Sequence, residues 1–570
     1  MAMDNMVEMQ TEVHCFQPAT PELAVEQLPK DLEKNVDKDR GGWRTFPFII
    51  GSELCAVIAV TGLAANMIVY LTTEFNINNI EATHIINISS GGIELAPLIG
   101  AFLTDAYLGR FWAISIGSVL STIAMILLML TAIIDPLRPS PCSPNLRAPG
   151  SCVRPTTGQY GVLYLYFALL TAGAAGAKYN SAAFGADQFV KGGGNQHQSF
   201  FNWYYCVFFV SIMIASTVIV YIQSNVSWAW GFGICVALKG ISLVLFLSGT
   251  RFYNCISPKG SPFTGLAQVV VASLRKRHLS LPSNGEDFYY GVRVQSGLPL
   301  TQQFSFLNKA AIKTSQDISA DGHSNPNPWR LCTVQQVEEL KSIIKTLTIW
   351  SGVIIPTILS SQQNTFSVLQ ALAMGRHLGS HFKIPAPSYI VFNFLTCAIT
   401  LGMYENMVVP WAAAKGIKIT QLRRIETGMV INIVGMAVAA IVERKRLNRS
   451  AEESAFWLLP QNVLIGVGEG LLSAGKIDFF YSEFPETVRS TATGLVAASR
   501  AAGFYLSSLL VSIIHQNTDW LNDGLNHSRL DCFYGILCVM GVLNFCYFTI
   551  CARWYKYKAK IDGSHNTSMP

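Results

Sequence analysis

The sequence is poor in charge for its length. Charged residues make up 13% of the 570 residues, whereas they make up roughly 25% of an average soluble protein. Hydrophobic residues account for 50%, which indicates a chain that lies mostly in lipid. The net charge of +6 at pH 7 is spread along the chain. It therefore does not indicate nucleic acid as a partner, and it suits loops that face anionic lipid.

Patterns of catalytic and metal-binding residues are also missing. The 13 cysteines include no C-x-x-C pair with zinc spacing, and no Ser-His-Asp arrangement or phosphate-binding loop is present. Neither a metal nor another cofactor is expected, and an enzyme is the least favoured class of protein. Cys142 and Cys152 flank a proline-rich loop that we expect outside the cytosol. The sequence leaves open whether these two cysteines form a disulfide.

The start of the chain lacks the apolar run of a cleavable signal peptide. Its first 40 residues are polar and of mixed charge. Residues 1–44 are therefore expected to form a cytosolic tail, and the first membrane helix is expected to carry the insertion signal.

What the chain does contain is a series of apolar segments, each near the length of about 20 residues that spans a bilayer. In the first half they lie near residues 46–71, 84–106, 111–134, 160–182, 203–222 and 228–249. In the second half they lie near residues 341–361, 388–409, 425–442, 455–481, 490–514 and 532–553. This pattern predicts an all-α membrane protein with about twelve transmembrane helices.

The segments form two groups of six on either side of a long polar stretch. We expect an N-terminal six-helix bundle at 45–249, a cytosolic linker at 250–340, a C-terminal six-helix bundle at 341–555 and a cytosolic tail at 556–570. Within the linker, 261–277 reads as an amphipathic helix along the membrane surface. Its apolar face is expected to hold Leu266, Val269, Val270 and Leu274.

Basic residues predict which side of the membrane each loop faces. They gather before the first helix, in the linker and after the last helix, which places both termini in the cytosol. The loop Glu443–Glu453 is an exception, because it carries four basic residues on the predicted outer side: Arg444, Lys445, Arg446 and Arg449. The plasma membrane and the vacuolar membrane both remain open as locations.

A short motif lies between the second and third helices. Residues 100–110 read Gly-Ala-Phe-Leu-Thr-Asp-Ala-Tyr-Leu-Gly-Arg, and they resemble the signature of the major facilitator superfamily. Asp105 and Arg110 are expected to hold this cytosolic turn against neighbouring helix ends and so to act in gating. The resemblance implies a major facilitator fold, in which two bundles rock around a solute site near the membrane midplane.

Several further motifs resemble the plant nitrate and peptide transporter family, the proton-dependent oligopeptide transporter group. They are Phe184–Phe189 (FGADQF), Phe200–Tyr204 (FFNWY) and Asp478–Tyr481 (DFFY), and the resemblance runs from about Gly41 to Lys558. The stretch Ser248–Tyr253 is most similar to the nitrate excretion subgroup. Family membership implies a membrane transporter for nitrate, chloride, peptides, hormones or glucosylated metabolites.

The chain departs from the family in a motif on the first helix. Family members usually carry E-x-x-E-R for proton coupling, and here the aligned run is Glu53-Leu-Cys-Ala56-Val57. Only the first acid is kept, which predicts reduced or altered proton coupling.

By resemblance, Lys178 and Glu469 align with the coupling lysine and acid of the family. Glu53 and Lys178 lie at matching depths in their helices, so we expect an ion pair between them. We further expect Lys178 to exchange between Glu53 and Glu469 as the bundles rock. A static ion pair that only supports packing is the alternative.

Candidate solute-binding residues lie on several helices. Glu469, Ser473, Lys476 and Phe480 fall on one face of the tenth helix. An uncharged polar group on the seventh and eighth helices comprises Ser360, Gln363, Asn364 and Asn393, which could bind solute or only join helices. Glu94 on the second helix could complement a cationic substrate, take over proton binding, or pair with Lys476 or Lys239.

The sequence thus predicts alternating-access transport of a small polar or charged solute. Nitrate or chloride and an organic metabolite such as a glucoside or alkaloid all remain open, with a slight preference for an organic solute. Weak proton coupling makes export one possible direction. The alternatives are a proton-coupled nitrate or peptide importer, and a membrane sensor with little flux. Membrane lipid is expected around the chain, and protons could accompany the solute.

Overall fold

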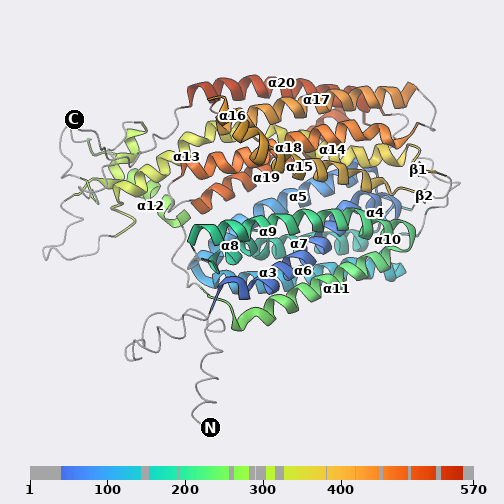
Figure 1. Ribbon diagram of the computed structural model, residues 1–570, viewed down its shortest axis with the longest axis horizontal. Helices are drawn as coiled ribbons and strands as arrows, with labels where there is room; N and C mark the ends of the chain where they lie inside the picture. The colour runs from blue at the N-terminus through green and yellow to red at the C-terminus, as the bar shows by residue number, and fades with distance from the viewer. Residues whose placement is uncertain are drawn as a thin grey trace, which may run out of the picture.

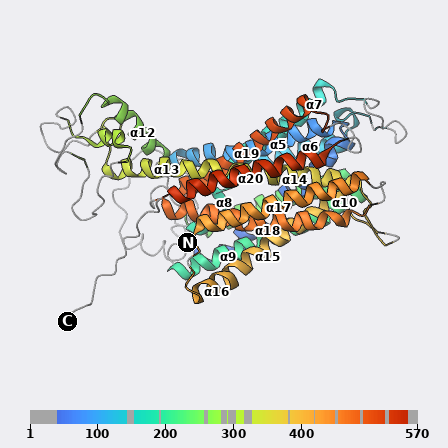
Figure 2. The ribbon, with the colours of Figure 1, turned by 90° about the horizontal axis from the view of Figure 1, so that it is seen from above.

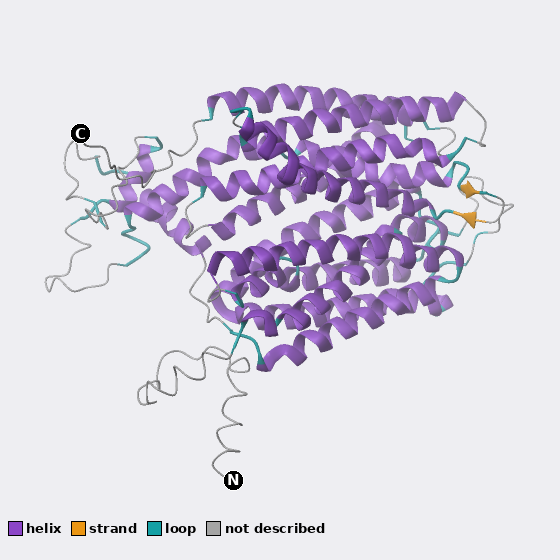
Figure 3. Cartoon of the chain, in the orientation of Figure 1, coloured by secondary structure: helices purple, strands orange, loops and turns teal. Residues whose placement is uncertain are grey.

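The computed structural model consists almost wholly of helices, with two short strands (Figures 1 and 3). It describes residues 40–140, 142, 153–189, 193–255, 262–280, 289–290, 303–314, 327–379, 382–417, 419–448, 453–484, 489–521 and 528–555. The terminal segments predicted as cytosolic tails lie almost entirely outside these residues.

The first group of helices forms the N-terminal bundle, shown in blue and green in Figure 1. Its membrane-crossing elements are α3 (Phe46–Ala65), α4 (Met67–Thr73), α5 (Asn79–Leu103), α6 (Gly109–Ile133), α7 (Thr157–Ala177), α8 (Asn180–Asp187), α9 (Gly193–Ile214), η6 (Ala215–Ile219), α10 (Val220–Asn225) and α11 (Trp228–Ser248). Short turns of helix, η1 (Gly42–Arg44), η2 (Thr104–Leu108), η3 (Asp135–Leu137) and η7 (Gly249–Arg251), lie at their ends.

The second group forms the C-terminal bundle, shown in yellow to red. Its elements are α13 (Val334–Gly352), α14 (Ile355–Leu372), η10 (Ala386–Ile390), α15 (Val391–Met403), η11 (Tyr404–Val408), α16 (Val409–Ala414), α17 (Gln421–Asn448), η12 (Ala455–Leu458), α18 (Leu459–Glu483), α19 (Arg489–Asn517) and α20 (Leu530–Trp554). The strands β1 (His377–Leu378) and β2 (Phe382–Lys383) pair in an antiparallel hairpin after α14.

Eleven helices of the described chain are long and apolar enough to cross a membrane. The remaining long helix, α18, has 25 residues, and its charges are Glu469, Lys476, Asp478 and Glu483. It packs against α17 and α15, so protein surrounds much of it where lipid would penalise charge. The twelve predicted segments therefore all correspond to helices, and the tenth owes its lower hydropathy to its polar residues.

The two bundles meet along α5 and α19. Figure 2 shows these two helices side by side, with α9 and α15 adjacent on the opposite side of the bundles. At the contact, a Cβ added to Gly91 would lie 2.8 Å from the ring of Tyr505. The absence of a side chain at Gly91 thus lets α19 approach α5 closely.

The linker folds into a small unit at one end of the molecule. Helix α12 (Pro262–Arg275) packs on η9 (Ser305–Ala311) and on the first turns of α13. Val269 is buried in this contact, whereas Val270 and Leu274 are exposed. The predicted helix is present, but its buried side faces the linker and α13, and the predicted apolar face is divided. Its placement at the membrane surface stays a prediction.

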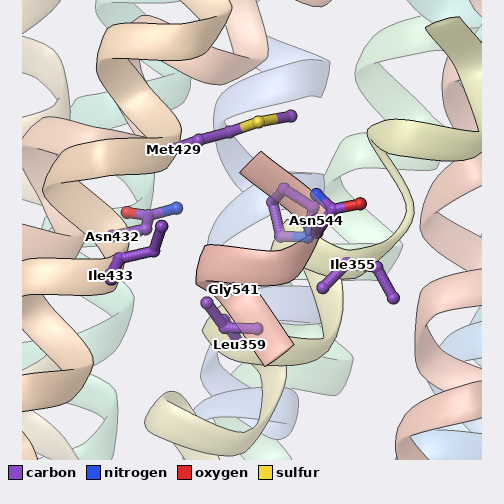
Figure 4. Close-up of a pocket in the computed structure, with 8 residues that line it drawn as sticks. Ile355, Leu359, Met429, Asn432, Ile433, Gly541 and Asn544 are labelled. Atoms are coloured by element: carbon purple, nitrogen blue, oxygen red, sulfur yellow. The ribbon is translucent and has the colours of Figure 1, made fainter. Parts of the chain in front are cut away.

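The seventh membrane crossing is broken between α13 and α14. Pro356 has no N–H, so the carbonyl of Gly352 loses its partner within the helix. The side chain of Asn544 on α20 donates to that carbonyl at 2.9 Å. A small cavity beside the break is lined by Ile355, Pro356, Leu359, Met429, Asn432, Ile433, Gly541 and Asn544 (Figure 4). Asn432 is fully buried there, and neither polar atom of its amide has a hydrogen-bond partner among the described residues.

The loop that breaks the charge rule contains a buried ion pair. Arg446 donates to both carboxylate oxygens of Glu443, at 2.7 and 2.9 Å, and Gln370 donates to Glu443 at 2.7 Å. The ammonium of Lys445 lies 3.2 Å from the ring centre of Trp457. Two of the four basic residues are therefore bound to other groups, which reduces their weight in predicting topology. Cys142 is disulfide-bonded, and Cys152 lies outside the described residues.

Candidate functional site

Glu94 lies at the centre of the molecule and is bound by three donors. It is 3% exposed, on α5. The ammonium of Lys178 and the guanidinium of Arg500 each lie 2.9 Å from its Oε1. The hydroxyl of Tyr179 donates to its Oε2 at 3.0 Å. The Glu94 carboxylate is therefore paired with two cations, one from each bundle.

Close packing of α5 against α7 brings Lys178 to Glu94. A Cβ added to Gly100 would lie only 1.8 Å from the carbonyl oxygen of Ala175, a separation that no side chain could occupy. The glycine lets the two backbones approach, and Lys178 and Tyr179 follow directly after α7. The predicted pairing of Glu94 with Lys476 or Lys239 is therefore replaced by pairing with Lys178 and Arg500.

The cations around Glu94 remain accessible to water. The Arg500 side chain is 46% exposed and that of Lys178 is 31% exposed, although Glu94 between them is 4% exposed. Both cations lie deep in the protein, within membrane-crossing segments. Part of the surface of each cation is thus left uncovered by protein where the two bundles meet.

Helix α18 adds a second pair of charges. Ser473 donates to Glu469 at 3.3 Å. Lys476 is 2% exposed and makes no hydrogen bond or ion pair with any described residue. It lies seven residues, or about two turns, after Glu469 on the same face of α18, and α18 packs against α19, which carries Arg500. Phe480, in contrast, is fully buried in an apolar cluster of the C-terminal bundle, and it does not lie with its predicted neighbours.

Glu53 has partners other than the predicted lysine. Ser181 donates to its Oε2 at 2.6 Å and Tyr204 donates to its Oε1 at 2.7 Å. Lys178 is held by Glu94 instead. The predicted Glu53–Lys178 ion pair is thus wrong in this conformation, because matching depth along two helices does not fix the direction in which each side chain points. Lys178 also makes no contact with Glu469 here, so its exchange between the two acids stays a prediction.

The two family motifs near the ends of helices meet in space. The guanidinium of Arg110 contacts the carboxylate of Asp187, in the Phe184–Phe189 motif. The backbone of Asp105 lies in the π-helical turn η2, and its side chain lies outside the described residues. The predicted gating role of both residues remains untested.

Of the uncharged polar group on α14 and α15, two members bond each other, and the others bond α18 or their own helix. Asn393 donates to Asn364 at 3.0 Å, and Gln363 donates to Asn462 at 3.3 Å. Ser360 donates to carbonyls of its own helix. The bonds of Asn393 and Gln363 join helices in this conformation, whereas the buried side-chain oxygen of Gln363 has no hydrogen-bond partner among the described residues. Both alternatives, solute binding and helix joining, therefore stay predictions.

Contacts between the bundles are concentrated on one side of the Glu94 cluster. Ser361 donates to Asn87 at 2.9 Å, His84 bonds Ser508 at 2.7 Å, and Ser388 donates to the carbonyl of Ser216 at 3.0 Å. Among described residues, no hydrogen bond or ion pair joins the bundles on the side of Glu94 that leads to η2. In the predicted orientation, the bundles are thus joined at their outer ends.

Sequence reasoning missed Arg500 and Tyr179. Arg500 stands alone in the run Gly494–Gly503, which is otherwise small, apolar or hydroxylic. Because an ionisable residue in a membrane segment carries a high insertion free energy, it is a functional candidate wherever it occurs. Arg500 could therefore have been picked out from the sequence. Tyr179 carried no comparable signal. The described residues contain no group of three or more His, Cys, Asp or Glu that could hold a metal ion.

Comparison with known proteins agrees with this architecture. The model of the POT family matches residues 111–525. Protein NRT1/PTR FAMILY 2.13 of Arabidopsis thaliana is 42% identical over 93% of this chain and 89% of its own length. Protein NRT1/PTR FAMILY 2.12 of the same plant is 40% identical over 92% of this chain and 93% of its own length.

Solved structures share the fold. The crystal structure of an auto-inhibited POT family peptide transporter superposes with a TM-score of 0.70, at 19% identity, over 91% of this chain and 99% of its own. The POT family transporter PepTSo gives a TM-score of 0.67, at 18% identity, over 90% and 98%. The chain belongs to the POT family, as a plant-type NRT1/PTR member, and is a membrane transporter and not an enzyme.

Proposed function

We propose that this protein carries a small anion across a membrane by alternating access. The observation that carries the proposal is the charge of the central cluster. Three cations, Lys178, Lys476 and Arg500, are grouped with two acids, Glu94 and Glu469. One positive charge has no acid to balance it, and an ionisable group within a membrane segment is usually paired or faces a water-filled path. An anion entering the water-accessible space would supply the missing charge.

The same geometry disfavours the cationic and neutral solutes that the sequence left open. Glu94 already accepts bonds from Lys178, Arg500 and Tyr179. It would have to give up these donors to hold the ammonium group of an alkaloid. A neutral glucoside would leave the excess positive charge unchanged. Nitrate, chloride or an organic anion fits the cluster better.

A competition for Arg500 could link solute binding to the rocking of the bundles. The Glu94–Arg500 pair joins α5 of one bundle to α19 of the other. An anion bound at the guanidinium would weaken that pair, and the bundles could then separate on the joined side. Glu94 would thereby take over the part that the sequence assigned to Glu53 and its exchange with Lys178. The membrane, the cytosolic termini and the nitrate excretion subgroup stay predictions.

The proposal is tested by transport into proteoliposomes that hold the purified protein. Labelled nitrate, chloride and an organic carboxylate are compared with a neutral glucoside and a quaternary ammonium ion. Anions are expected to be carried, and Arg500→Gln or Lys476→Met is expected to reduce their uptake about tenfold or more, since a bond to a charged group contributes about 1.5–3 kcal/mol. Arg423→Gln, an exposed site on α17, is the matched control.

Two results would overturn the proposal. The first is uptake of the neutral or cationic solute without uptake of any anion. The second is anion uptake that is unchanged in both cavity variants while their expression and folding match those of the parent protein.

A further inference from the structure

Lys239 is a buried cation that lies outside the central cluster. It is on α11 and 3% exposed. It makes no hydrogen bond or ion pair with any described residue. A lysine in the middle of a membrane segment costs about 2.5–3.5 kcal/mol on insertion scales and is usually paired. Its burial therefore calls for a counter-ion near by.

Contacts between α3 and α11 place Lys239 opposite the part of α3 that contains Glu53. A Cβ on Gly51 would meet Leu245, Ser52 bonds Ser242 at 3.0 Å, and a Cβ on Gly62 would meet Cys235. Residue numbers rise on one helix as they fall on the other, so the helices are antiparallel. Lys239, between Cys235 and Ser242, is thus level with the α3 turn that follows Glu53.

Within that turn, α3 supplies no cation of its own. Ala56 and Val57 stand one turn beyond Glu53 on α3, and residues three or four apart share a helix face. Glu53 is the one acidic residue of α3, Phe46–Ala65, and it lies at the start of that turn. We propose that Lys239 is the counter-ion of Glu53 and keeps its carboxylate ionised, so that Glu53 acts as a fixed charge and not as a proton carrier.

The other groups that face Glu53 support the same ionised form. Ser181, on α8, and Tyr204, on α9, both donate hydrogen bonds to its carboxylate, and donors to a charged acid favour its charged form. Lys178, at the junction of α7 and α8, is held by Glu94 and is not free to pair with Glu53. Lys239 is therefore the cation that remains for this acid. Lys239 is therefore a positioning residue, since it acts through Glu53.

The test is the pH profile of transport between about pH 5 and pH 8, the range in which a carboxyl group that is buried without a counter-ion gains or loses its proton. Lys239→Met is expected to add a pH-dependent step to the parent profile, because Glu53 then takes up a proton within that range. The step should vanish in the double variant Lys239→Met with Glu53→Gln. Lys239→Arg keeps the charge and should retain the parent profile.

A lysine that only supports helix packing would give different results in these experiments. If Lys239→Met lowers the rate but leaves the shape of the pH profile unchanged, or if its new step persists in the double variant, the proposal fails. Infrared spectroscopy of the parent protein provides a test that does not depend on the folding of any Lys239 variant. A carboxylic acid C=O band at neutral pH that disappears in Glu53→Gln would show that Glu53 is protonated and would overturn the proposal. Neither readout depends on the solute being an anion.

Discussion

Glu94 shows how far a single residue can be understood from sequence. Its presence as an acid in a membrane helix made it a candidate for binding a cationic substrate, for binding a proton, or for pairing with a lysine. The partner itself could not be predicted. Depth along a helix follows from residue number, but the side of the helix that faces a neighbour depends on backbone approaches such as that of Gly100 to Ala175. The same limit explains the misplaced Glu53–Lys178 pair.

Replacing Glu94 with Gln should damage both transport and stability. Lys178 and Arg500 would lose their shared carboxylate, and breaking a buried pair costs about 3–5 kcal/mol, reduced here by the exposure of both cations to water. We expect a lower thermal unfolding temperature and a loss of most anion uptake. Both are measured on purified protein, with fluorescence-detected unfolding for stability.

Glu426→Gln on α17 is the control for this change, because it removes an acid that forms no ion pair with a described residue. A Glu94→Gln protein that unfolds at the temperature of the parent and transports normally would remove Glu94 from the centre of the mechanism.

At the scale of elements, hydropathy located the membrane helices but not their interruptions. The breaks between α3 and α4 and between α13 and α14 fall inside continuous apolar runs. The second break depends on Pro356 and on a side chain from α20, which is distant in sequence. The fold of the linker could not be predicted for a similar reason. Helix α12 packs against residues that are distant in sequence, such as Leu307 and Val334.

Asn544→Leu should destabilise the seventh crossing. The Gly352 carbonyl would lose its donor, and an unsatisfied buried polar group costs about 1–3 kcal/mol. Asn432→Leu at the same cavity is the matched control. It removes an amide with no partner, so it should leave the unfolding temperature unchanged or raise it. Equal losses in the two variants would contradict this account of the break.

Gly100→Ala tests the contact that positions Lys178. The added Cβ would lie 1.8 Å from the Ala175 carbonyl, so α5 and α7 must separate and Lys178 must move from Glu94. We expect poor folding or a loss of most uptake, measured by monodispersity in detergent and by transport. Gly161→Ala, on α7 with nothing within 4 Å of its added Cβ, should have little effect. Normal transport by Gly100→Ala would exclude a tight α5–α7 contact.

At the scale of the whole molecule, the two-bundle arrangement was predictable and its state was not. The number of apolar segments and the Gly100–Arg110 motif were sufficient to predict two bundles of six helices. Which end of the bundles is joined depends on pairs such as His84 with Ser508, and the sequence gives no sign of which side chains on α5 and α19 face each other. The basic loop at Glu443–Glu453 was an exception to the charge rule, and Arg446 in it is neutralised by Glu443 inside the bundle.

Alternating access predicts that locking the joined end stops transport. His84 and Ser508 have side chains 2.7 Å apart on α5 and α19. His84→Cys with Ser508→Cys, in a protein whose exposed Cys206 and Cys546 are replaced by serine, should cross-link under oxidation and lose uptake. A reductant should restore uptake, and neither single variant should respond. Full uptake by the cross-linked protein would mean that these ends do not separate during transport.

The course of α13 has a mechanical consequence. This helix begins beside α12 in the linker and ends at Gly352, where the seventh crossing breaks. Its 19 residues make a stiff rod of about 28 Å. If the linker moves, α13 would therefore rotate as a unit about Gly352. Helix α14, beyond the break, need not move with it. Movement of the linker would thus change the tilt of α13, with the break at Gly352 as the hinge.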